Sequence, residues 1–275
     1  MVPTAINGLA SLAIQWRLKF RNLFGDDLRN HWFVLMAAAA NGMITSLQAK
    51  RVKVVIEAII VTASILFLSV IVEAGEVANM VLKWGFEDNS VDQPPAGFTF
   101  GRTGSGRLGR WLVKSEKNAP SGVNVLAQTD DDATSYRFPV AVADSVSPRN
   151  FRLSVRCKTL SGKVDQACGL VFRYRDENNY YVVRSNALEN NIRLYFVKDG
   201  KRQQFAGWDG PVANGVWHEL RASANGDRLE IYWNGKKVIE ATDRVFPDGG
   251  KVGLWTKADS VTYFDELTVE SLDPK

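Results

Sequence analysis

The chain has 275 residues, of which 45% are hydrophobic, so it can bury a sizeable core and is not a disordered protein. Its 34 Lys and Arg residues against 30 Asp and Glu give a formal net charge of +4, a mixed surface that argues against nucleic acid as a partner. Two cysteines, Cys157 and Cys168, are too few for a multi-disulfide scaffold or a four-thiolate zinc site.

The first distinctive segment is the apolar run Val54–Val72, which follows a basic flank at residues 50–53. This layout is typical of a signal peptide, and the small residues around Ala74 fit cleavage after that position. One alternative is a signal anchor, although the run barely reaches the roughly 20 apolar residues that a bilayer needs and contains Glu57. Another is a buried core helix, although no other helical segment of similar apolarity exists for it to pack against. The signal peptide and the anchor both predict an N-terminal hydrophobic helix within residues 51–74 and an exported remainder of the chain.

Residues 1–50 form an N-terminal extension ahead of this segment. Signal peptides rarely begin so far inside a chain, and a start at Met43 would give one of conventional length. Residues 1–42 are then an artefact of the assigned start; the alternative is a genuine cytoplasmic or interfacial segment ahead of a single-pass anchor. The sequence leaves both open, and contact with a membrane is expected only through the hydrophobic segment.

From Trp84 onward the sequence changes to short alternating runs separated by turn signals, a pattern typical of a β-sandwich or barrel. Asn-Gly and Asp-Gly pairs tolerate the positive φ of tight hairpins, so successive runs are expected to be antiparallel neighbours. Residues 92–122, rich in Gly and Pro, are expected to form loops and edges around short strands such as Arg110–Val113. Further strands are predicted at Arg152–Thr159, Gly169–Arg175, Tyr180–Asn186, Ile192–Lys198, His218–Ala224, Arg228–Trp233, Lys236–Thr242, Gly250–Lys257 and Val261–Glu270.

Three stretches carry a family resemblance: GLVFRYRDENNYYVVRSNALENNIRLYFVKDGKR (169–202), WHELRASANGDRLEIYWNGKKVIEATD (217–243) and GGKVGLWTKADSVTYFDELTVE (249–270). They resemble exported bacterial domains of the concanavalin A-like lectin and glucanase superfamily, often grouped with laminin-G-like modules and 3-keto-disaccharide hydrolase domains. The resemblance implies an all-β, two-sheet antiparallel jelly-roll sandwich over residues 84–275. It implies no single function, because members of the superfamily include lectins, glycan-binding modules, hydrolases and domains of unknown role.

No catalytic constellation is recognisable in the sequence. A family 16 glycoside hydrolase would carry Glu-x-Asp-x-x-Glu on one strand, because alternate positions face one cleft and two carboxylates must flank the scissile bond. That spacing is missing, and Asp265 faces opposite Glu266 and Glu270 in a regular strand. His218 has no nucleophile motif nearby, and the glycine-rich stretch 101–109 is expected to be a flexible loop, because a dinucleotide fingerprint must open a helix.

Alternation along four of the predicted strands points to a ligand-binding face. On each strand, two polar or aromatic side chains share one side of the backbone. Guanidinium groups donate paired hydrogen bonds to hydroxyls and aromatic rings stack on sugars, so this set suits a saccharide, including an anionic one. The alternative is a solvated sheet face with ordinary cross-strand pairs. The candidate ligand-binding residues are Arg173, Arg175, Arg184, Asn186, Arg193, Tyr195, Trp255 and Lys257.

A second candidate site joins the two ends of the β domain. Glu87 and Asp88 lie near the first predicted strand and Asp265 near the last, and jelly rolls of this superfamily bring their terminal strands side by side. Carboxylate oxygens that meet there would suit a structural calcium ion, with backbone carbonyls completing its shell. The alternative is that these three are exposed acidic residues at strand ends.

The cysteines flank a Ser-Gly turn and are expected on adjacent antiparallel strands. An exported protein could bridge Cys157 to Cys168, and two reduced thiols packed in the core are the alternative.

Taken together, the sequence favours a non-catalytic glycan-binding or surface-interaction module that acts outside the cytoplasm, whether periplasmic, extracellular or membrane-anchored. Carbohydrate is the expected partner. An enzyme of the 3-keto-disaccharide hydrolase type, which the resemblance permits, and a purely structural extracytoplasmic domain are the alternatives.

Overall fold

The structure is a computed structural model that describes residues 80–273. The signal peptide or anchor predicted at residues 51–74 and the N-terminal extension lie outside the described residues. Within residues 80–273, no helix has the length and apolar character needed to cross a membrane. The strands are β1 (Val81–Trp84), β2 (Phe98–Gly104), β3 (Trp111–Ser115), β4 (Asn124–Gln128), β5 (Arg137–Ala143), β6 (Phe151–Ser161), β7 (Ala167–Asp176), β8 (Asn179–Asn186), β9 (Asn191–Lys198), β10 (Lys201–Asp209), β11 (His218–Asn225), β12 (Arg228–Trp233), β13 (Lys236–Thr242), β14 (Lys251–Trp255) and β15 (Val261–Ser271).

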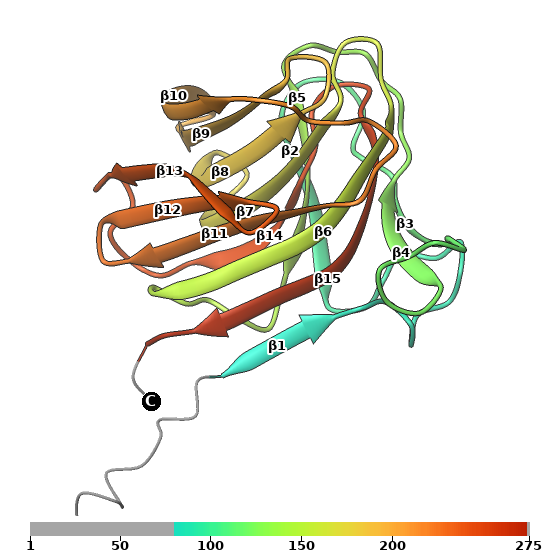
Figure 1. Ribbon diagram of the computed structural model, residues 1–275, viewed down its shortest axis with the longest axis horizontal. Helices are drawn as coiled ribbons and strands as arrows, with labels where there is room; N and C mark the ends of the chain where they lie inside the picture. Colours follow the sequence, from blue (N-terminus) through green and yellow to red (C-terminus); the bar gives the residue numbers. More distant parts are fainter. Residues whose placement is uncertain (1–79, 274–275) are drawn as a thin grey trace, which may run out of the picture. The chain divides into compact units, whose positions relative to one another are not determined.

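These strands form two antiparallel sheets that pack face to face (Figure 1). The eight-stranded sheet has the order β13-β12-β11-β6-β15-β4-β3, and β1 also pairs with β15. The seven-stranded sheet has the order β10-β9-β8-β7-β14-β5-β2. The jelly-roll sandwich expected from the sequence is therefore confirmed, and its first and last strands do lie side by side.

The strands predicted from Arg152 to Glu270 all form, with ends within two residues of the expected positions. Strand β1 extends the sheet to residues that precede Trp84. Residues 101–104, expected to lie in a flexible loop, are part of β2. Strands β4, β5 and β10 were not predicted.

The main core lies between the two sheets. Apolar side chains at alternate positions, such as Leu170 and Leu254 of the seven-stranded sheet, share it with Leu153 and Leu220 of the eight-stranded sheet. Because side chains alternate between the two faces of a strand, the same strands leave a second set of residues on the outer faces of the sandwich. Both candidate binding surfaces described below lie on those outer faces.

A disulfide joins Cys157 to Cys168 across this core. Cys157 belongs to β6 in one sheet and Cys168 to β7 in the other, with their Cα atoms 6.3 Å apart. The expectation that the two cysteines lie on adjacent strands of a hairpin is wrong, because the chain crosses from one sheet to the other between them. The bridge therefore links the two layers of the sandwich.

Removal of this bridge is expected to destabilise the domain. A Cys157→Ala/Cys168→Ala double variant should lose about 2 to 4 kcal/mol of unfolding free energy, because the cross-link restricts the unfolded chain. Urea titration with and without a thiol reductant measures the loss: reductant should weaken the parent protein and leave the double variant unchanged. Two free thiols per chain, counted under denaturing, non-reducing conditions, would contradict the bridge.

The outer face of the seven-stranded sheet is filled by a second apolar cluster. Its buried members come from five of the seven strands, β5, β7, β8, β9 and β14. No such cluster is found on the outer face of the eight-stranded sheet among residues 80–273. The second cluster consists of Phe138, Val140, Val142, Ala167, Val171, Tyr180, Val182, Tyr195, Val197 and Trp255.

The turns of the β7–β8 and β9–β10 hairpins fold over this cluster. In the β7–β8 turn, the Glu177 carbonyl accepts the Thr103 hydroxyl of β2, which also hydrogen-bonds the Tyr180 hydroxyl at 2.7 Å. In the β9–β10 turn, the Gly200 carbonyl accepts the Tyr136 hydroxyl at 2.9 Å. Since β2 lies at the opposite edge of the sheet from β9 and β10, the sheet must curl strongly for these contacts to form.

Two backbone irregularities accompany this curl. Arg173 has φ 48°, and the register of β7 with β8 shifts between Phe172 and Asp176. The register of β9 with β10 shifts between Gln204 and Ala206. Bulges of this kind bend a strand and increase its twist, so they direct the two hairpin turns over the outer face.

Candidate functional site

The structure brings four of the predicted ligand-binding residues together at one end of the seven-stranded sheet. Arg184 and Asn186 of β8 lie on its outer face with Tyr195 of β9, and Lys257 follows β14. Three further polar side chains, which the sequence analysis did not single out, join them. We call this set the Arg184 cluster: Asp165, Arg184, Asn186, Glu189, Asn191, Tyr195 and Lys257.

Arg184 is the centre of one half of the cluster. Its guanidinium donates to the Glu189 carboxylate at 2.6 Å, to the Tyr195 hydroxyl at 3.1 Å and to the Asn191 side-chain oxygen. The residue is 3% exposed, whereas the Glu189 side chain is 44% exposed. The cluster therefore runs from a buried cation to a carboxylate at the surface.

Asp165 is the centre of the other half. This fully buried carboxylate accepts the Lys257 ammonium and, at 3.0 Å, the Asn186 side-chain amide. Asn186 joins the two halves, because its side-chain oxygen accepts the backbone amide of Glu189 at 3.2 Å. Donors and acceptors thus alternate through one continuous network.

The charges of the cluster are paired. Burial raises the pKa of Asp165 even though the Lys257 ammonium opposes that change. Against the effect of burial, the Arg184 charge holds the pKa of Glu189 below its usual value. The cluster therefore contains two opposite-charge pairs, Arg184 with Glu189 and Lys257 with Asp165.

Glycines lie beside the large side chains of this face, where a Cβ atom would collide with them. Gly169 pairs with Arg184 on one side and with Trp255 on the other, and a Cβ there would approach the Trp255 ring at 3.0 Å. Gly207 pairs with Arg193, where a Cβ would lie 2.7 Å from Arg193 Cδ. The sheet thus accommodates the indole and both guanidinium groups in one row of directly opposed positions.

Trp255 lies on the expected face but is fully buried, so the prediction of an exposed stacking platform is wrong. Its ring stacks on Phe138 with centroids 5.2 Å apart. The Arg202 guanidinium covers this group, 4.5 Å from the Phe138 centroid and 4.4 Å from that of Tyr195. Arg202 was missed because β10 was not predicted, and the folded hairpin turns leave the indole inside the second cluster.

Arg193 also lies on the expected face, but it is directed toward the edge of the sheet. Its guanidinium donates to the Trp208 carbonyl at 3.0 Å and pairs with Asp209 of β10. Within residues 80–273 its hydrogen-bond partners are Ile192, Trp208 and Asp209, although it lies opposite Arg184 across the strands, and its side chain stays 18% exposed. Arg193 therefore flanks the Arg184 cluster without being part of its network.

Arg173 and Arg175 do not reach this face, and their assignment to it is wrong. The buried Arg173 guanidinium donates to the carbonyls of Phe246 at 2.9 Å and Arg149 at 3.1 Å. Arg175 pairs with Asp248 at 3.0 Å and lies over the Phe246 ring, which belongs to the main core. The bulge at Arg173 interrupts the alternation on which the assignment depended.

Two of the three predicted calcium ligands accept hydrogen bonds from the backbone. Glu87 accepts the amides of Val123 and Asn124 at 3.0 and 2.8 Å, and Asp265 accepts the Ser121 amide at 2.9 Å. Burial, with the nearby charges of Glu266 and Glu87, raises the pKa of Asp265 to about 6.

Asp88, the third predicted ligand, is exposed. Across residues 80–273, no three or more His, Cys, Asp or Glu side chains are grouped to hold a metal ion. The expectation that Glu87, Asp88 and Asp265 assemble a calcium site is therefore wrong, because two of these carboxylates fix the β3–β4 loop instead.

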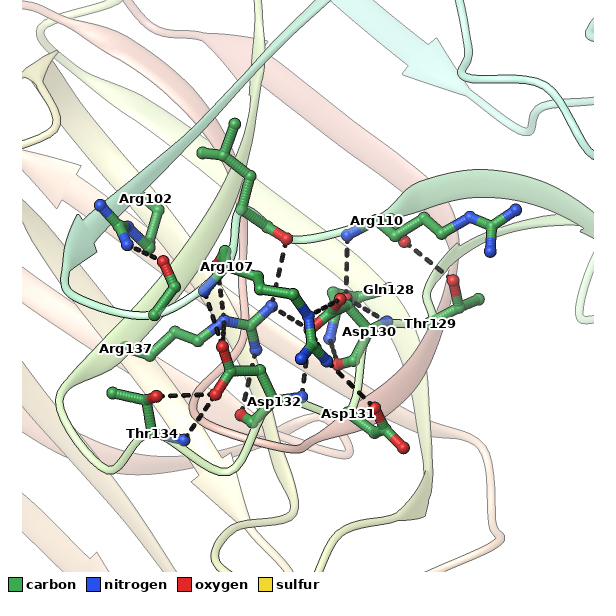
Figure 2. Close-up of polar contacts among 12 residues, drawn as sticks. Arg102, Arg107, Arg110, Gln128, Thr129, Asp130, Asp131, Asp132, Thr134 and Arg137 are labelled. Atoms are coloured by element: carbon green, nitrogen blue, oxygen red, sulfur yellow. Dashed lines mark hydrogen bonds and ion pairs between the residues drawn. The ribbon is translucent and has the colours of Figure 1, made fainter.

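A further polar network holds the loop between β4 and β5 (Figure 2). The buried Arg137 guanidinium pairs with Asp130 at 2.7 Å, and Arg107 pairs with Asp130 from the solvent side at 2.9 Å. The Arg107 amide, together with the hydroxyl and amide of Thr134, holds the pKa of Asp132 well below its usual range. This network fixes the loop that carries Tyr136, the residue that reaches the β9–β10 turn.

The similarity of this chain to known proteins concerns its fold. No family model matches the chain. The levanase of Bacillus subtilis (strain 168) is 26% identical over 132 residues, which are 47% of this chain and 19% of the levanase. The chain thus spans about a fifth of the length of that curated relative.

Two solved structures share the architecture. The carbohydrate-binding module CBM66 from Bacillus subtilis has a TM-score of 0.50 at 24% identity, over 64% of this chain and 96% of that one. A Bacillus subtilis protein of unknown function with a galectin-like fold has a TM-score of 0.52 at 11% identity, over 70% and 96%. The described domain is therefore an all-β, two-sheet antiparallel jelly-roll sandwich. At these identities the likeness establishes the fold, and function has to be argued from the surfaces.

Proposed function

We propose that residues 80–273 form a non-catalytic carbohydrate-binding module and that the Arg184 cluster binds the saccharide. The observation that carries the proposal is the convergence of guanidinium, ammonium, carboxylate, amide and phenol groups at one end of this fold. Two similarities support it: one solved relative is a carbohydrate-binding module, and the curated relative is named for its action on levan.

The paired charges favour a ligand that presents hydroxyl groups. Arg184 and Lys257 each have a carboxylate partner, so the cluster offers no uncompensated cation. Sugar hydroxyls both donate and accept, and they match a site in which donors and acceptors alternate. We therefore propose a neutral saccharide at this site, in place of the anionic one that the sequence also allowed.

The same pairing favours binding over hydrolysis. Asp165 and Glu189 are the two carboxylates of the cluster, and each already accepts a cation and a side-chain amide. A glycosidase needs one carboxyl group that can deliver a proton and another that can attack or activate water. Calcium has no part in this proposal, because Glu87 and Asp265, two of the three predicted ligands, accept backbone amides.

The disulfide between Cys157 and Cys168 supports a place of action outside the cytoplasm. Structural disulfides persist in oxidising compartments and are rare where thiol reductants are abundant. A periplasmic, extracellular or membrane-anchored location of this domain is part of the proposal.

A glycan array probed with the 275-residue chain tests the proposal, with levan included among the glycans. Arg184→Gln should weaken binding of the best glycan about tenfold or more, because it removes charge-assisted hydrogen bonds. Lys257→Gln should weaken it as well, and titration calorimetry measures both. Arg175→Gln is the matched control and should bind like the parent, because Arg175 lies outside the cluster.

Circular dichroism of each variant separates lost binding from lost folding. Folded Arg184→Gln and Lys257→Gln variants with the affinity of the parent would rule out the Arg184 cluster as the site. A parent chain that binds no glycan of the array would rule out the function.

A further inference from the structure

A hollow of about 380 Å³ lies on the outer face of the eight-stranded sheet, over β6, β11 and β12. Its floor includes Ser223 of β11, which pairs with Arg152 of β6 on one side and Glu230 of β12 on the other. Arg221 precedes Ser223 by two positions, so both side chains leave the same face of the strand. A small residue surrounded by long charged ones produces the depression, which we call the Arg221 hollow.

Arg221 differs from the other arginines of the hollow. Its guanidinium lies 4.1 Å from the centroid of the Tyr232 ring, and its Nε is buried without a hydrogen-bond partner. No ion pair of Arg221 is present among residues 80–273, whereas Arg152 pairs with Glu270 at 2.9 Å and Arg228 with Glu230 at 2.8 Å. Stacking on the Tyr232 ring therefore holds the Arg221 guanidinium in place, while the hydrogen-bonding capacity of this guanidinium is unused.

The charges around Arg221 otherwise cancel. Three cations, Arg152, Arg228 and Lys237, interact with three carboxylates, Glu230, Glu240 and Glu270. Arg221 supplies the one positive charge that these residues leave uncompensated. The hollow is thus matched to a ligand with a single negative charge.

The other polar groups of the hollow indicate which class of ligand it would bind. Ser223 and Asn225 offer a hydroxyl and an amide, and the Glu230 carboxylate offers further acceptor positions beside Arg221. A planar carboxylate can take two parallel hydrogen bonds from one guanidinium, while the hydroxyls of a sugar ring can use the neutral groups. A nucleic acid or an anionic lipid surface would instead bring many negative charges against the three carboxylates.

From this geometry we propose that the Arg221 hollow is a second saccharide site, for a sugar residue that carries one carboxylate, such as a uronic acid. It lies on the sheet opposite to the Arg184 cluster and does not depend on that cluster. The chain would then hold a neutral and an acidic glycan on its two outer faces.

Titration calorimetry of the 275-residue chain with galacturonic acid, which carries one carboxylate, tests the site at low ionic strength, with galactose as the neutral counterpart. Galacturonic acid should bind, and the binding should weaken as salt screens the charge of Arg221. Galactose should not compete with it for the site. Arg221→Gln should lower the affinity at least tenfold, and Arg221→Lys should lower it less, because a lysine keeps the charge without the planar fork.

Two further variants make the outcome decisive. Ser223→Leu should fill the hollow and weaken binding without a change of charge. This variant tests the site even if Arg221→Gln does not fold. Lys114→Gln removes a cation from β3 of the same sheet and should bind like the parent, as should Arg184→Gln, which tests the other site.

Equal loss in Lys114→Gln and Arg221→Gln would show that binding is only a response to overall charge, and would overturn the proposal. So would the absence of binding by the parent chain at millimolar galacturonic acid. Loss of neutral-glycan binding in Arg184→Gln alone would leave this site intact.

Discussion

Replacement of Trp255 by Ala will lower the free energy of unfolding by about 3 to 5 kcal/mol. The indole is fully buried between Phe138 and Arg202, in the apolar cluster under the folded hairpin turns. Its loss would leave a cavity that those turns cannot fill without moving, because they are held by Thr103 of the edge strand β2 and by Tyr136, which directly precedes β5. Urea unfolding followed by circular dichroism measures the change without relying on tryptophan fluorescence.

Trp208→Ala is the matched control for this variant. Trp208 is only partly buried against the main core, so the same substitution removes less apolar area from a packed environment. We expect a loss clearly smaller than that of Trp255→Ala. A loss below about 1 kcal/mol for Trp255→Ala, combined with a loss of glycan binding, would restore the interpretation of Trp255 as a stacking platform.

Arg137→Met will cost a similar amount, about 3 to 5 kcal/mol, for an electrostatic reason. The Arg137 guanidinium is fully buried, pairs with Asp130 and donates to the carbonyls of Arg107 and Leu108 at 2.7 and 3.3 Å. It also donates to the carbonyl of Ala258. A methionine fills much of the same volume. It leaves the largely buried Asp130 carboxylate and these carbonyls without the hydrogen-bond donors of the Arg137 guanidinium.

Arg107→Met separates the buried pair from the surface pair. Arg107 binds the same Asp130 carboxylate, but its side chain is 61% exposed, and exposed ion pairs contribute at most about 1 kcal/mol. Chemical denaturation of both variants should therefore give a several-fold larger loss for Arg137→Met. Equal losses would show that the network acts at the surface and not in the interior.

Much of the fold could be predicted because most strands are half-buried. In β11, for example, Leu220 and Ala222 face the core while Arg221 and Ser223 face outward, and that alternation is visible in the sequence. The seven residues of β5 are all buried, so the strand has no polar alternation to reveal it. Strand β10 begins with polar residues and contains a register shift, which breaks the expected period.

The candidate site could be predicted only where strands are regular. Alternation placed Arg184 and Asn186 on the correct face of β8, and the adjacent strand contributes Tyr195 as expected. Asp165 and Glu189 lie in connections between strands, whose course the period of a strand does not determine. Arg173 adopts a left-handed backbone conformation that its residue type does not signal, and the bulge reverses the facing of the residues after it.

The pairing of β1 with β15 has a mechanical consequence. Val81 pairs with Glu270 and Trp84 with Leu267, so the outer ends of the first and last strands lie together at one corner of the sheet (Figure 1). Tension applied between these two ends would load the hydrogen bonds one after another, as a zipper opens. Tension between the start of β1 and a glycan held on the body of the sandwich would act along the strand and load those bonds together. The domain would therefore resist a pull through its ligand better than a pull through its two ends.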